Sequence, residues 1–281
     1  MKTGMILEGG AMRGLFTAGV IDVLMEQGIQ VDGVIGVSAG AAFGCNYKSR
    51  QIGRVLRYTT TYARDPRYGG IRSLIKTGDI YGVEFCYHEI PEKLDLFDEE
   101  TYRSNNVDFY VTCTDVATGQ PVYHKCETTR GDDLEWIRAS ASMPMVSRVV
   151  KIGEKELLDG GISDSIPLAY FQSMGYEKNI VVLTQPRGYT KKKNKALPLM
   201  RWFLKKYPKV LETMAHRHEQ YNETLDFIKK EEEKGKVLVI CPEEALNIGR
   251  MENHPEKLTE VYEKGRKVAE QQLEKIKAFL K

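Results

Sequence analysis

The first 37 residues of the chain read as a strand, a helix and a second strand. Residues 3–7 and 31–37 are short apolar runs, and residues 15–27 between them carry apolar side chains at helical spacing before Gly28. A glycine just after the last periodic residue is a common helix terminator. Two strands joined by a helix form a parallel pair with a right-handed crossover. This pattern therefore predicts an α/β fold.

The rest of the chain extends the same pattern. Hydrophobic residues make up 42% of the chain and charged residues 28%, which is ordinary for a globular protein. We expect a three-layer α/β/α fold with a mostly parallel central sheet and C-terminal helices. Further strands are predicted at 108–112, 121–124, 147–152, 155–158, 179–183 and 236–240, and long helices at 208–234 and 255–280.

The composition shifts near Gln185, where a basic segment begins. We expect residues 1–185 to form a catalytic core. Residues 186–281 contain the basic segment, helices and a further core-type strand. The return to core-type sequence at 236–240 indicates that this second part packs as part of the same domain.

A serine flanked by glycines follows the second predicted strand. The sequence is Gly36-Val37-Ser38-Ala39-Gly40, and the small residues after it can continue as a tightly packed helix. When a strand turns sharply into a helix, a serine at the tip is exposed, and glycines on either side avoid collisions. The pattern predicts a nucleophile elbow, with a glycine-rich turn of no chemical role as the alternative.

A glycine-rich loop, Gly9 to Gly14, lies between the first strand and its helix. Residues with little side chain leave backbone N–H groups free to point at one centre, and the helix start adds partial positive charge there. In acyl transfer such donors stabilise the oxyanion, and loss of one costs about 3 kcal/mol in the barrier. Since the loop and the elbow follow neighbouring strands of a doubly wound sheet, we expect them to share one crevice.

An acidic residue ends a later predicted strand. Asp159 comes directly after an apolar run and is followed by Gly160 and Gly161. A carboxylate within about 2.6–3.2 Å of a serine oxygen can act as its general base. Asp159 is therefore a candidate base, and a turn aspartate that caps its own backbone is the alternative.

Four motifs occur in an order that one family shares. They are a glycine loop with Arg13-Gly14, then Gly-x-Ser-x-Gly, then Ala-Ser-x-x-x-Pro at 139–144, and then Asp-Gly-Gly. Over about residues 3–185, the chain resembles the patatin-like phospholipase family. The resemblance implies hydrolysis of lipid acyl esters, of the phospholipase A or lysophospholipase type, with no cofactor and no metal.

The resemblance also implies roles for individual residues. Ser38 would be the nucleophile and Asp159 its sole partner, in a dyad without histidine. The amides of Gly9, Gly10 and Ala11 would form the oxyanion hole. The family usually has glycine where Ala11 stands, and a side chain there costs about 1 kcal/mol if φ is positive. The remaining motif positions are Arg13, Gly14, Gly36, Gly40, Gly160 and Gly161.

Three alternatives remain open at this point. An α/β-hydrolase with a Ser-His-Asp triad would need a later histidine, and His216, His218 and His254 are available. Their charged, helical surroundings favour a solvated helix face instead. A nucleotide-binding module could use the glycine loop, although the full G-x-G-x-x-G spacing is missing. A non-catalytic membrane-binding module is a further alternative.

Charge and cysteine content limit the partners and the compartment. The net charge of +2 gives no reason to expect nucleic acid as a partner. Five widely spaced cysteines without a CxxC pair favour free thiols in a reducing compartment. The first residues carry no long apolar stretch, which argues against a secretory signal. We expect a cytoplasmic protein.

The segment 187–209 combines many lysines with Trp202 and Phe203. A basic segment with such a patch could give peripheral, transient contact with an anionic membrane surface. The interpretation that the sequence favours is a solvated loop followed by a short helix whose apolar residues cover the core.

Overall fold

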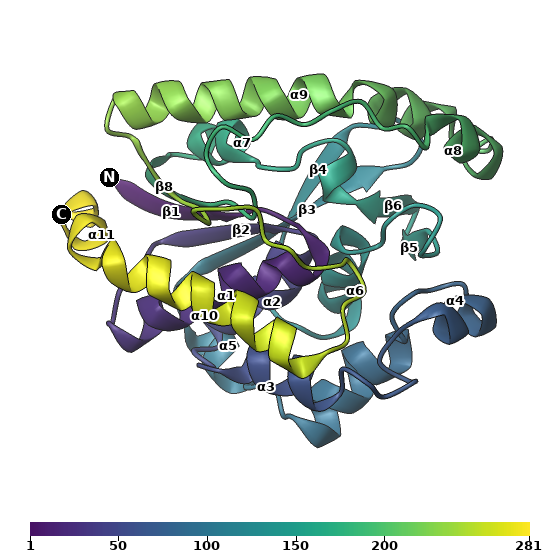
Figure 1. Cartoon of the computed structure of the whole chain (residues 1–281), viewed down its shortest axis with the longest axis horizontal. Coiled ribbons are helices and arrows are strands. Elements are labelled where there is room, and N and C mark those ends of the chain that lie inside the picture. The colour runs from purple at the N-terminus through teal and green to yellow at the C-terminus, as the bar shows by residue number, and fades with distance from the viewer.

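Eight strands form one sheet between two layers of helices in the computed structural model, which describes residues 1–281 (Figure 1). The strand order is β5-β6-β3-β2-β1-β7-β8, with β4 also paired to β3. Strands β8, β7, β1, β2 and β3 are parallel, whereas β4, β5 and β6 run antiparallel to their neighbours. The strands are β1 (Lys2–Leu7), β2 (Gly33–Val37), β3 (Asp108–Asp115), β4 (Pro121–Lys125), β5 (Val150–Ile152), β6 (Lys155–Asp159), β7 (Tyr176–Val182) and β8 (Val237–Ile240).

The helices cover both faces of the sheet. Figure 1 shows α1, α2 and α10 on one face and α7 and α9 on the other. This arrangement confirms the predicted three-layer fold class. The α-helices are α1 (Gly14–Glu26), α2 (Ala39–Lys48), α3 (Arg54–Thr61), α4 (Ile71–Thr77), α5 (Glu99–Ser104), α6 (Gly131–Ser140), α7 (Leu168–Ser173), α8 (Leu197–Phe203), α9 (Pro208–Glu233), α10 (Pro255–Gln271) and α11 (Leu273–Leu280). In addition, η1 (Ala11–Arg13) and η3 (Gly160–Ile162) are short 3-10 helices, and η2 (Glu84–Leu94) is a π-helix.

The central strands are apolar on both sides because both faces of the sheet are covered. Successive side chains of a strand point to opposite faces. Accordingly, Met5 and Leu7 of β1 join the core beneath α1 and α2, while Ile6 joins the core beneath α7 and α9. The predicted strand, helix and strand at the start of the chain are β1, α1 and β2.

The C-terminal part of the chain packs against the first part at two places. Strand β8 pairs in parallel with β7. Helix α10 crosses α1 so closely that a Cβ on Gly19 would lie 2.1 Å from the carbonyl oxygen of Tyr262, and one on Gly265 would lie 2.0 Å from that of Phe16. The two glycines therefore set how near these helices approach.

Some predicted elements have different limits. The strand expected from residue 147 begins only at Val150, because residues 141–149 form turns and irregular structure. The single helix expected over 255–280 is interrupted at Gln272 and becomes α10 and α11. None of the helices combines the length and apolar character that crossing a bilayer requires.

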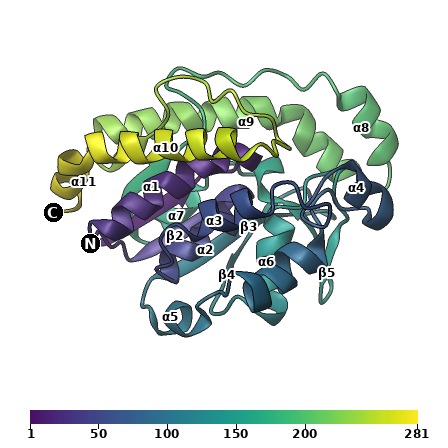
Figure 2. The ribbon, with the colours of Figure 1, turned by 60° about the horizontal axis from the view of Figure 1, so that its bottom comes forward.

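The carboxyl ends of the parallel strands point to one end of the molecule. In Figure 1, β1 runs from the N-terminus on the left toward the end where α4 and α8 lie, and Figure 2 shows α4 and α8 together at that end. Loops that follow parallel strands meet at this edge, which is where open α/β sheets bind ligands.

Candidate active site

Ser38 occupies the sharp turn between β2 and α2. Its backbone has φ 56° and ψ −121°, which is a strained conformation for a residue with a side chain. A Cβ on Gly36 would lie 2.5 Å from the Gly40 carbonyl oxygen, and a Cβ on Gly40 would lie 2.2 Å from that of Leu7. Both glycines are thus required by close backbone contacts, and the local geometry is that of the predicted elbow.

Asp159 lies beside Ser38 although 121 positions separate them in the chain. Ser38 Oγ donates a hydrogen bond to Asp159 Oδ2 at 2.6 Å, and both side chains are buried. The second carboxylate oxygen of Asp159 accepts the Gly161 N–H at 2.7 Å. The carboxylate is therefore fixed by its own loop while it faces the serine hydroxyl.

The surroundings of Asp159 act on its pKa in opposite directions. Burial raises the pKa of this carboxyl above its ordinary value. The hydrogen bonds from Ser38 and Gly161 and the positive charges of Arg217 and Arg250 lower it. A buried carboxylate with few solvent contacts is a better proton acceptor than an exposed one, and the cations favour its ionised form.

Hydrogen bonds to residues at the end of α6 and just after it also hold the turn that contains Ser38 and the neighbouring Asp159. Ser140, at the end of α6, accepts the Ser38 N–H at its Oγ at 2.9 Å and donates to the Thr112 carbonyl at 2.7 Å. The Ser142 carbonyl accepts the Asp159 N–H at 2.9 Å. Residues 139–144, which the sequence indicated only as one of the four family motifs, thus support both sides of the Ser38–Asp159 pair.

The glycine loop lies directly against the elbow. A Cβ on Gly9 would be 2.8 Å from Ser38 Cβ and 2.8 Å from the Val37 carbonyl oxygen, so only glycine fits there. The N–H groups of Gly9 and Gly10 have no protein acceptor. Ala11 has φ 51°, which meets the condition under which its side chain strains the loop.

Glu8 anchors the loop at its start. It is 4% exposed, and its carboxylate accepts hydrogen bonds from the Thr184 N–H at 2.6 Å and from the Tyr221 hydroxyl at 2.6 Å. Tyr221 belongs to α9, so a residue far along the chain fixes the position of the loop. No sequence pattern indicates this contact, because nothing distinguishes Tyr221 from the other residues of a long polar helix.

The other predicted motif residues lie around this centre. A Cβ on Gly14, at the start of α1, would meet Ala39 Cβ at 2.8 Å, and one on Gly160 would meet the Thr112 carbonyl at 2.1 Å. Gly161 would bring a Cβ to 3.0 Å from Asp159 Oδ1. The Arg13 side chain lines a cavity next to Ser38, and its Nε is buried without an acceptor.

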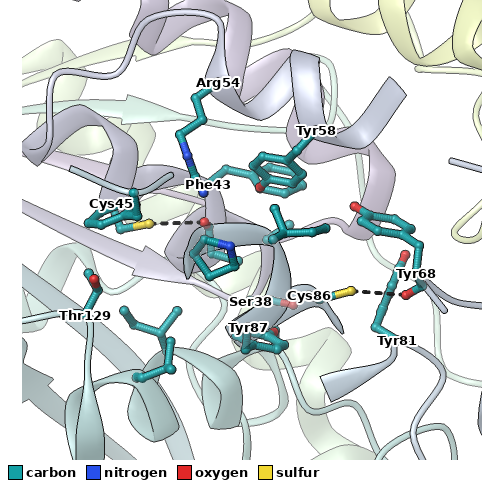
Figure 3. A pocket seen from close by; sticks show the side chains of 18 of the residues that line it. Ser38, Phe43, Cys45, Arg54, Tyr58, Tyr68, Tyr81, Cys86, Tyr87 and Thr129 are labelled. Carbon is teal, nitrogen blue, oxygen red and sulfur yellow. Dashed lines mark hydrogen bonds between the residues drawn. The ribbon is translucent and has the colours of Figure 1, made fainter. Parts of the chain in front are cut away.

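Two cavities meet at Ser38. One is apolar and is shown in Figure 3, where Phe43, Tyr58, Tyr68 and Tyr81 surround a space that opens beside Ser38. The other is polar and is lined by the glycine loop, Asp159 and basic side chains. Ala11, Ser38 and Met143 line both. A substrate with an apolar and a polar part could therefore occupy both cavities with its reacting bond at Ser38.

Four cationic side chains in the polar cavity were not predicted as site residues. They are Lys191, Lys192, Arg217 of α9 and Arg250, and Arg217 Nε donates a hydrogen bond to the Gly161 carbonyl. Lys191 and Lys192 lie in the basic segment 187–209, which the sequence indicated only as a solvated loop or a membrane contact. The cations come from separate segments that meet only in the folded chain, so no local motif could have identified them.

The histidines have other partners than the serine. His216 Nδ1 lies within hydrogen-bond distance of Glu219, and His254 Nδ1 within hydrogen-bond distance of Glu252. His218 lines the polar cavity, and its nearest carboxylate partner is also Glu219. No histidine hydrogen-bonds to Ser38 or to Asp159.

One group of side chains has the composition of a metal site. His124, Cys126 and Asp133 bring their potential ligand atoms within 4.8 Å of one another. Asp133, however, already accepts hydrogen bonds from His124 at 2.6 Å and from the backbone N–H groups of Glu127 and Thr128. These bonds account for the cluster as a local structural feature, and we assign no metal to it.

The family model named patatin-like phospholipase matches residues 5–171, which is more than half of the chain. The chain therefore belongs to the patatin-like phospholipase family, a family of lipid ester hydrolases. Residues 207–281 match a separate model, a domain of unknown function named DUF6363.

Similar proteins differ in how much of their length is matched. The uncharacterized protein YjjU of Escherichia coli K12 is 28% identical over 276 residues, which cover 94% of this chain and 75% of that protein. Lysophospholipase nte1 of Emericella nidulans is 27% identical over 183 residues, which cover 61% of this chain but only 11% of that enzyme. Among solved structures, VipD from Legionella pneumophila aligns with a TM-score of 0.49 and 13% identity, over 98% of this chain and 67% of that one.

Proposed function

We propose that the protein is a serine acyl-ester hydrolase that acts on lipids, of the phospholipase A or lysophospholipase type, through a Ser38–Asp159 dyad. One observation carries the proposal, namely the buried hydrogen bond of 2.6 Å from Ser38 Oγ to Asp159 Oδ2. Since the pair lies at the tip of an elbow, the serine oxygen can approach a carbonyl carbon from the open side.

In the first half-reaction, Asp159 takes the hydroxyl proton of Ser38 as Oγ bonds to the ester carbonyl carbon. The negative charge moves to the carbonyl oxygen, and we assign its stabilisation to the amides of Gly9, Gly10 and Ala11. The intermediate then breaks the bond to the alcohol, which leaves with the proton from Asp159. An acyl group remains on Ser38.

In the second half-reaction, Asp159 accepts a proton from a water molecule as that water attacks the acyl-enzyme. The bond to Ser38 Oγ breaks, Oγ recovers the proton, and the fatty acid leaves. A single carboxylate can serve both halves because it ends each half in its starting form. Burial of Asp159 and its fixed orientation toward Oγ support this double role.

The apolar cavity supports an acyl chain as the part of the substrate on one side of the ester. Of the 21 residues that line it, 17 are hydrophobic, and the cavity opens at Ser38. An alkyl chain gains free energy in such surroundings in proportion to the apolar surface it buries. The relatives named lysophospholipase agree with a lipid substrate.

The remaining motif residues act by position in this proposal. Gly36, Gly40 and Gly14 permit the close packing of elbow, loop and helix, while Gly160 and Gly161 orient the aspartate. We also propose that 1–185 and 186–281 form one domain, since β8 extends the sheet and Tyr221 of α9 anchors the loop.

The test is the turnover of a chromogenic acyl ester by Ser38→Ala and Asp159→Asn variants, together with fluorophosphonate labelling. We expect a loss of about 10⁴-fold for either variant and no labelling of Ser38→Ala. Ser173→Ala, at an exposed helix end, serves as the matched control. Full activity in either dyad variant contradicts the dyad, and an inactive His218→Gln variant with an active Asp159→Asn variant indicates a triad instead.

Two experimental results would contradict a catalytic function and indicate a binding function instead. Retained binding to lipid vesicles with no labelling of the wild-type protein indicates a non-catalytic membrane module. Thermal stabilisation by nucleotides with no labelling indicates a nucleotide-binding module.

We further propose that α8 gives the protein transient contact with a membrane surface. The sequence favoured apolar residues that cover the core, and Leu197, Met200 and the following Leu204 do so. In contrast, Leu199, Trp202 and Phe203 are 55%, 69% and 49% exposed. The expectation was thus wrong for the outer side of this helix.

The position of α8 supports this contact. It lies at the end of the molecule to which the strands point, and α4 at the same end also has exposed apolar side chains, Ile71 and Ile75 (Figure 2). Aromatic and aliphatic side chains among lysines suit the boundary of an anionic bilayer. Flotation with phosphatidylglycerol vesicles is expected to decrease for the Trp202→Ala, Phe203→Ala double variant and to stay at wild-type level for Leu96→Ala, another exposed position. Equal flotation of all three proteins contradicts the proposal.

A further inference from the structure

The polar cavity beside Ser38 carries more positive than negative charge. Five cationic side chains line it, and the only carboxylates there are Glu8 and Asp159. None of the five has a carboxylate within 4.0 Å, although most other charged clusters of the protein form such pairs. The five cations are Arg13, Lys191, Lys192, Arg217 and Arg250.

The two carboxylates do not neutralise these cations. Glu8 accepts hydrogen bonds from Thr184 and Tyr221, and Asp159 accepts hydrogen bonds from Ser38 and Gly161. Their oxygens are therefore used within the protein. The cavity is left with cationic donors that have no anionic partner.

Three of these donors, Arg13, Lys191 and Arg217, are partly buried, which makes the missing partner costly. Lys192 and Arg250 are exposed. Arg13 Nε has no acceptor in the protein. Burial lowers the pKa of Arg217, and it lowers the pKa of Lys191 to about 8, together with the nearby charges of Arg217, Arg13 and Arg250. Like charges held together out of water repel one another, and an anion placed between them removes that cost.

Most of the cations come from outside the family core. The family model ends at residue 171, whereas Lys191, Lys192, Arg217 and Arg250 follow it, and the last two lie within the domain of unknown function. The C-terminal region thus contributes charge as well as packing to the candidate site.

We propose that this cavity binds the phosphate of a lipid whose headgroup carries a net negative charge, and that the C-terminal region supplies this specificity. The inference rests on the proposed hydrolase function. The ester carbonyl of a phospholipid lies between its acyl chain and its phosphate, and the reacting Ser38 lies between the apolar and the cationic cavity.

The positive charge of the cavity also distinguishes between lipid headgroups. A zwitterionic headgroup such as phosphocholine brings an ammonium group next to its phosphate, and that ammonium would meet the same unpaired cations. Phosphoglycerol or a phosphomonoester brings no positive charge. Arginine and lysine donors around a phosphate suit the anionic lipids in particular.

The test compares kcat/KM for lysophosphatidylglycerol, lysophosphatidylcholine and a monoacylglycerol with the same acyl chain, each at equal mole fraction in neutral detergent micelles. We expect the wild-type protein to prefer the anionic lipid over the zwitterionic one by about tenfold or more. Lys191→Gln and Arg250→Gln are each expected to reduce that ratio by about fivefold. Lys193→Gln is the matched control, because Lys193 is exposed and does not line the cavity.

Each outcome separates the inference from the function on which it rests. If no acyl ester is hydrolysed, the proposed function itself fails. Hydrolysis with equal rates for all headgroups leaves the function standing and overturns the headgroup site. A ratio that falls equally in Lys193→Gln assigns the preference to general surface charge and also overturns it.

Free phosphate is the other source of the same chemistry. Thermal stabilisation by inorganic phosphate that is lost in Lys191→Gln and Arg250→Gln, without any headgroup preference, would identify a free-phosphate site and overturn the lipid assignment.

Discussion

The hydroxyl of Tyr221 donates a hydrogen bond of 2.6 Å to Glu8 Oε1, across 213 positions of the chain. Glu8 directly precedes the glycine loop, and Tyr221 lies in the middle of α9. The loop that faces the serine is therefore positioned by a helix from the other end of the chain.

Removal of this hydroxyl is expected to loosen the glycine loop. In Tyr221→Phe, the buried Glu8 carboxylate loses one of its donors, which costs about 1–3 kcal/mol of unfolding free energy. We expect kcat for an acyl ester to fall by about tenfold, with KM changed less, because the proposed oxyanion donors of this loop would act in the transition state.

Denaturant unfolding and steady-state kinetics measure the two effects. Tyr189→Phe is the control, since Tyr189 packs edge-on against Tyr221 but its hydroxyl makes no hydrogen bond to the protein. Equal losses in both variants would mean that loss of a tyrosine hydroxyl in this region in general, not the Glu8 contact, is responsible.

The acid limb of the pH profile should depend on Arg217. Asp159 must be ionised to accept a proton, and the charge of Arg217 lowers its pKa. In Arg217→Gln this effect is lost, so the pKa of Asp159 rises and activity appears only at higher pH. The measurement is kcat/KM for a neutral acyl ester between pH 4 and pH 8.

Arg187→Gln provides the comparison for this pH shift. Arg187 pairs with Glu232 and is not among the charges that act on Asp159. An acid limb that stays in place in Arg217→Gln contradicts the assignment of Asp159 as the base.

Replacement of Ala11 by glycine should stabilise the fold. Ala11 has φ 51°, where a Cβ is strained, and glycine adopts this conformation freely. We expect the free energy of unfolding to rise by about 1 kcal/mol in Ala11→Gly. In Ala42→Gly, inside α2, the same substitution should lower it by about 1 kcal/mol.

Urea denaturation measures the free energy of unfolding of both variants. Changes of opposite sign in Ala11→Gly and Ala42→Gly would attribute the effect to backbone conformation. A loss of stability in Ala11→Gly would show that the methyl group contributes more through packing than it costs in strain.

Stability should fall between acidic and neutral pH because of Asp22. This carboxylate is 2% exposed on α1, and burial raises its pKa to about 6 from an ordinary 3.8. A group whose folded pKa is raised contributes stability below its unfolded pKa and loses it as the pH rises through the folded value. The loss amounts to roughly 2–3 kcal/mol between pH 4 and pH 7.

Asp22→Asn is expected to remove this pH dependence. The asparagine oxygen can still accept from the Tyr262 hydroxyl and the Gly53 N–H, which both contact one oxygen of Asp22. Thermal denaturation at several pH values measures the effect, with the exposed Asp226→Asn as control. An unchanged pH profile in Asp22→Asn would assign the dependence to other groups.

Local patterns predicted much of the fold, because its first half consists of short-range units. The strand–helix–strand order at the start depends on neighbours in sequence, and it was predicted correctly. The break at Gln272 was missed because residues on both sides of it continue an apolar helical stripe.

The contacts around the candidate site were harder to predict for a physical reason. Tyr221, Arg217 and Arg250 reach it only through the packing of α9 and of the loop after β8, and no motif surrounds them. Ser140 lay within a recognised motif, but its hydrogen bond to the Ser38 amide depends on where α6 ends in space. The exposed side of α8 depends on which of its residues reach the core.

Strand β8 occupies an outer edge of the sheet, and it covers the backbone of β7 along Asn179, Ile180, Val181 and Val182. A chain cut before β8 would leave those amides and carbonyls bare on a long apolar strand. Bare edges of this kind recruit strands from other molecules, so such a fragment should self-associate and precipitate. We therefore expect the last third of the chain to protect the protein from aggregation.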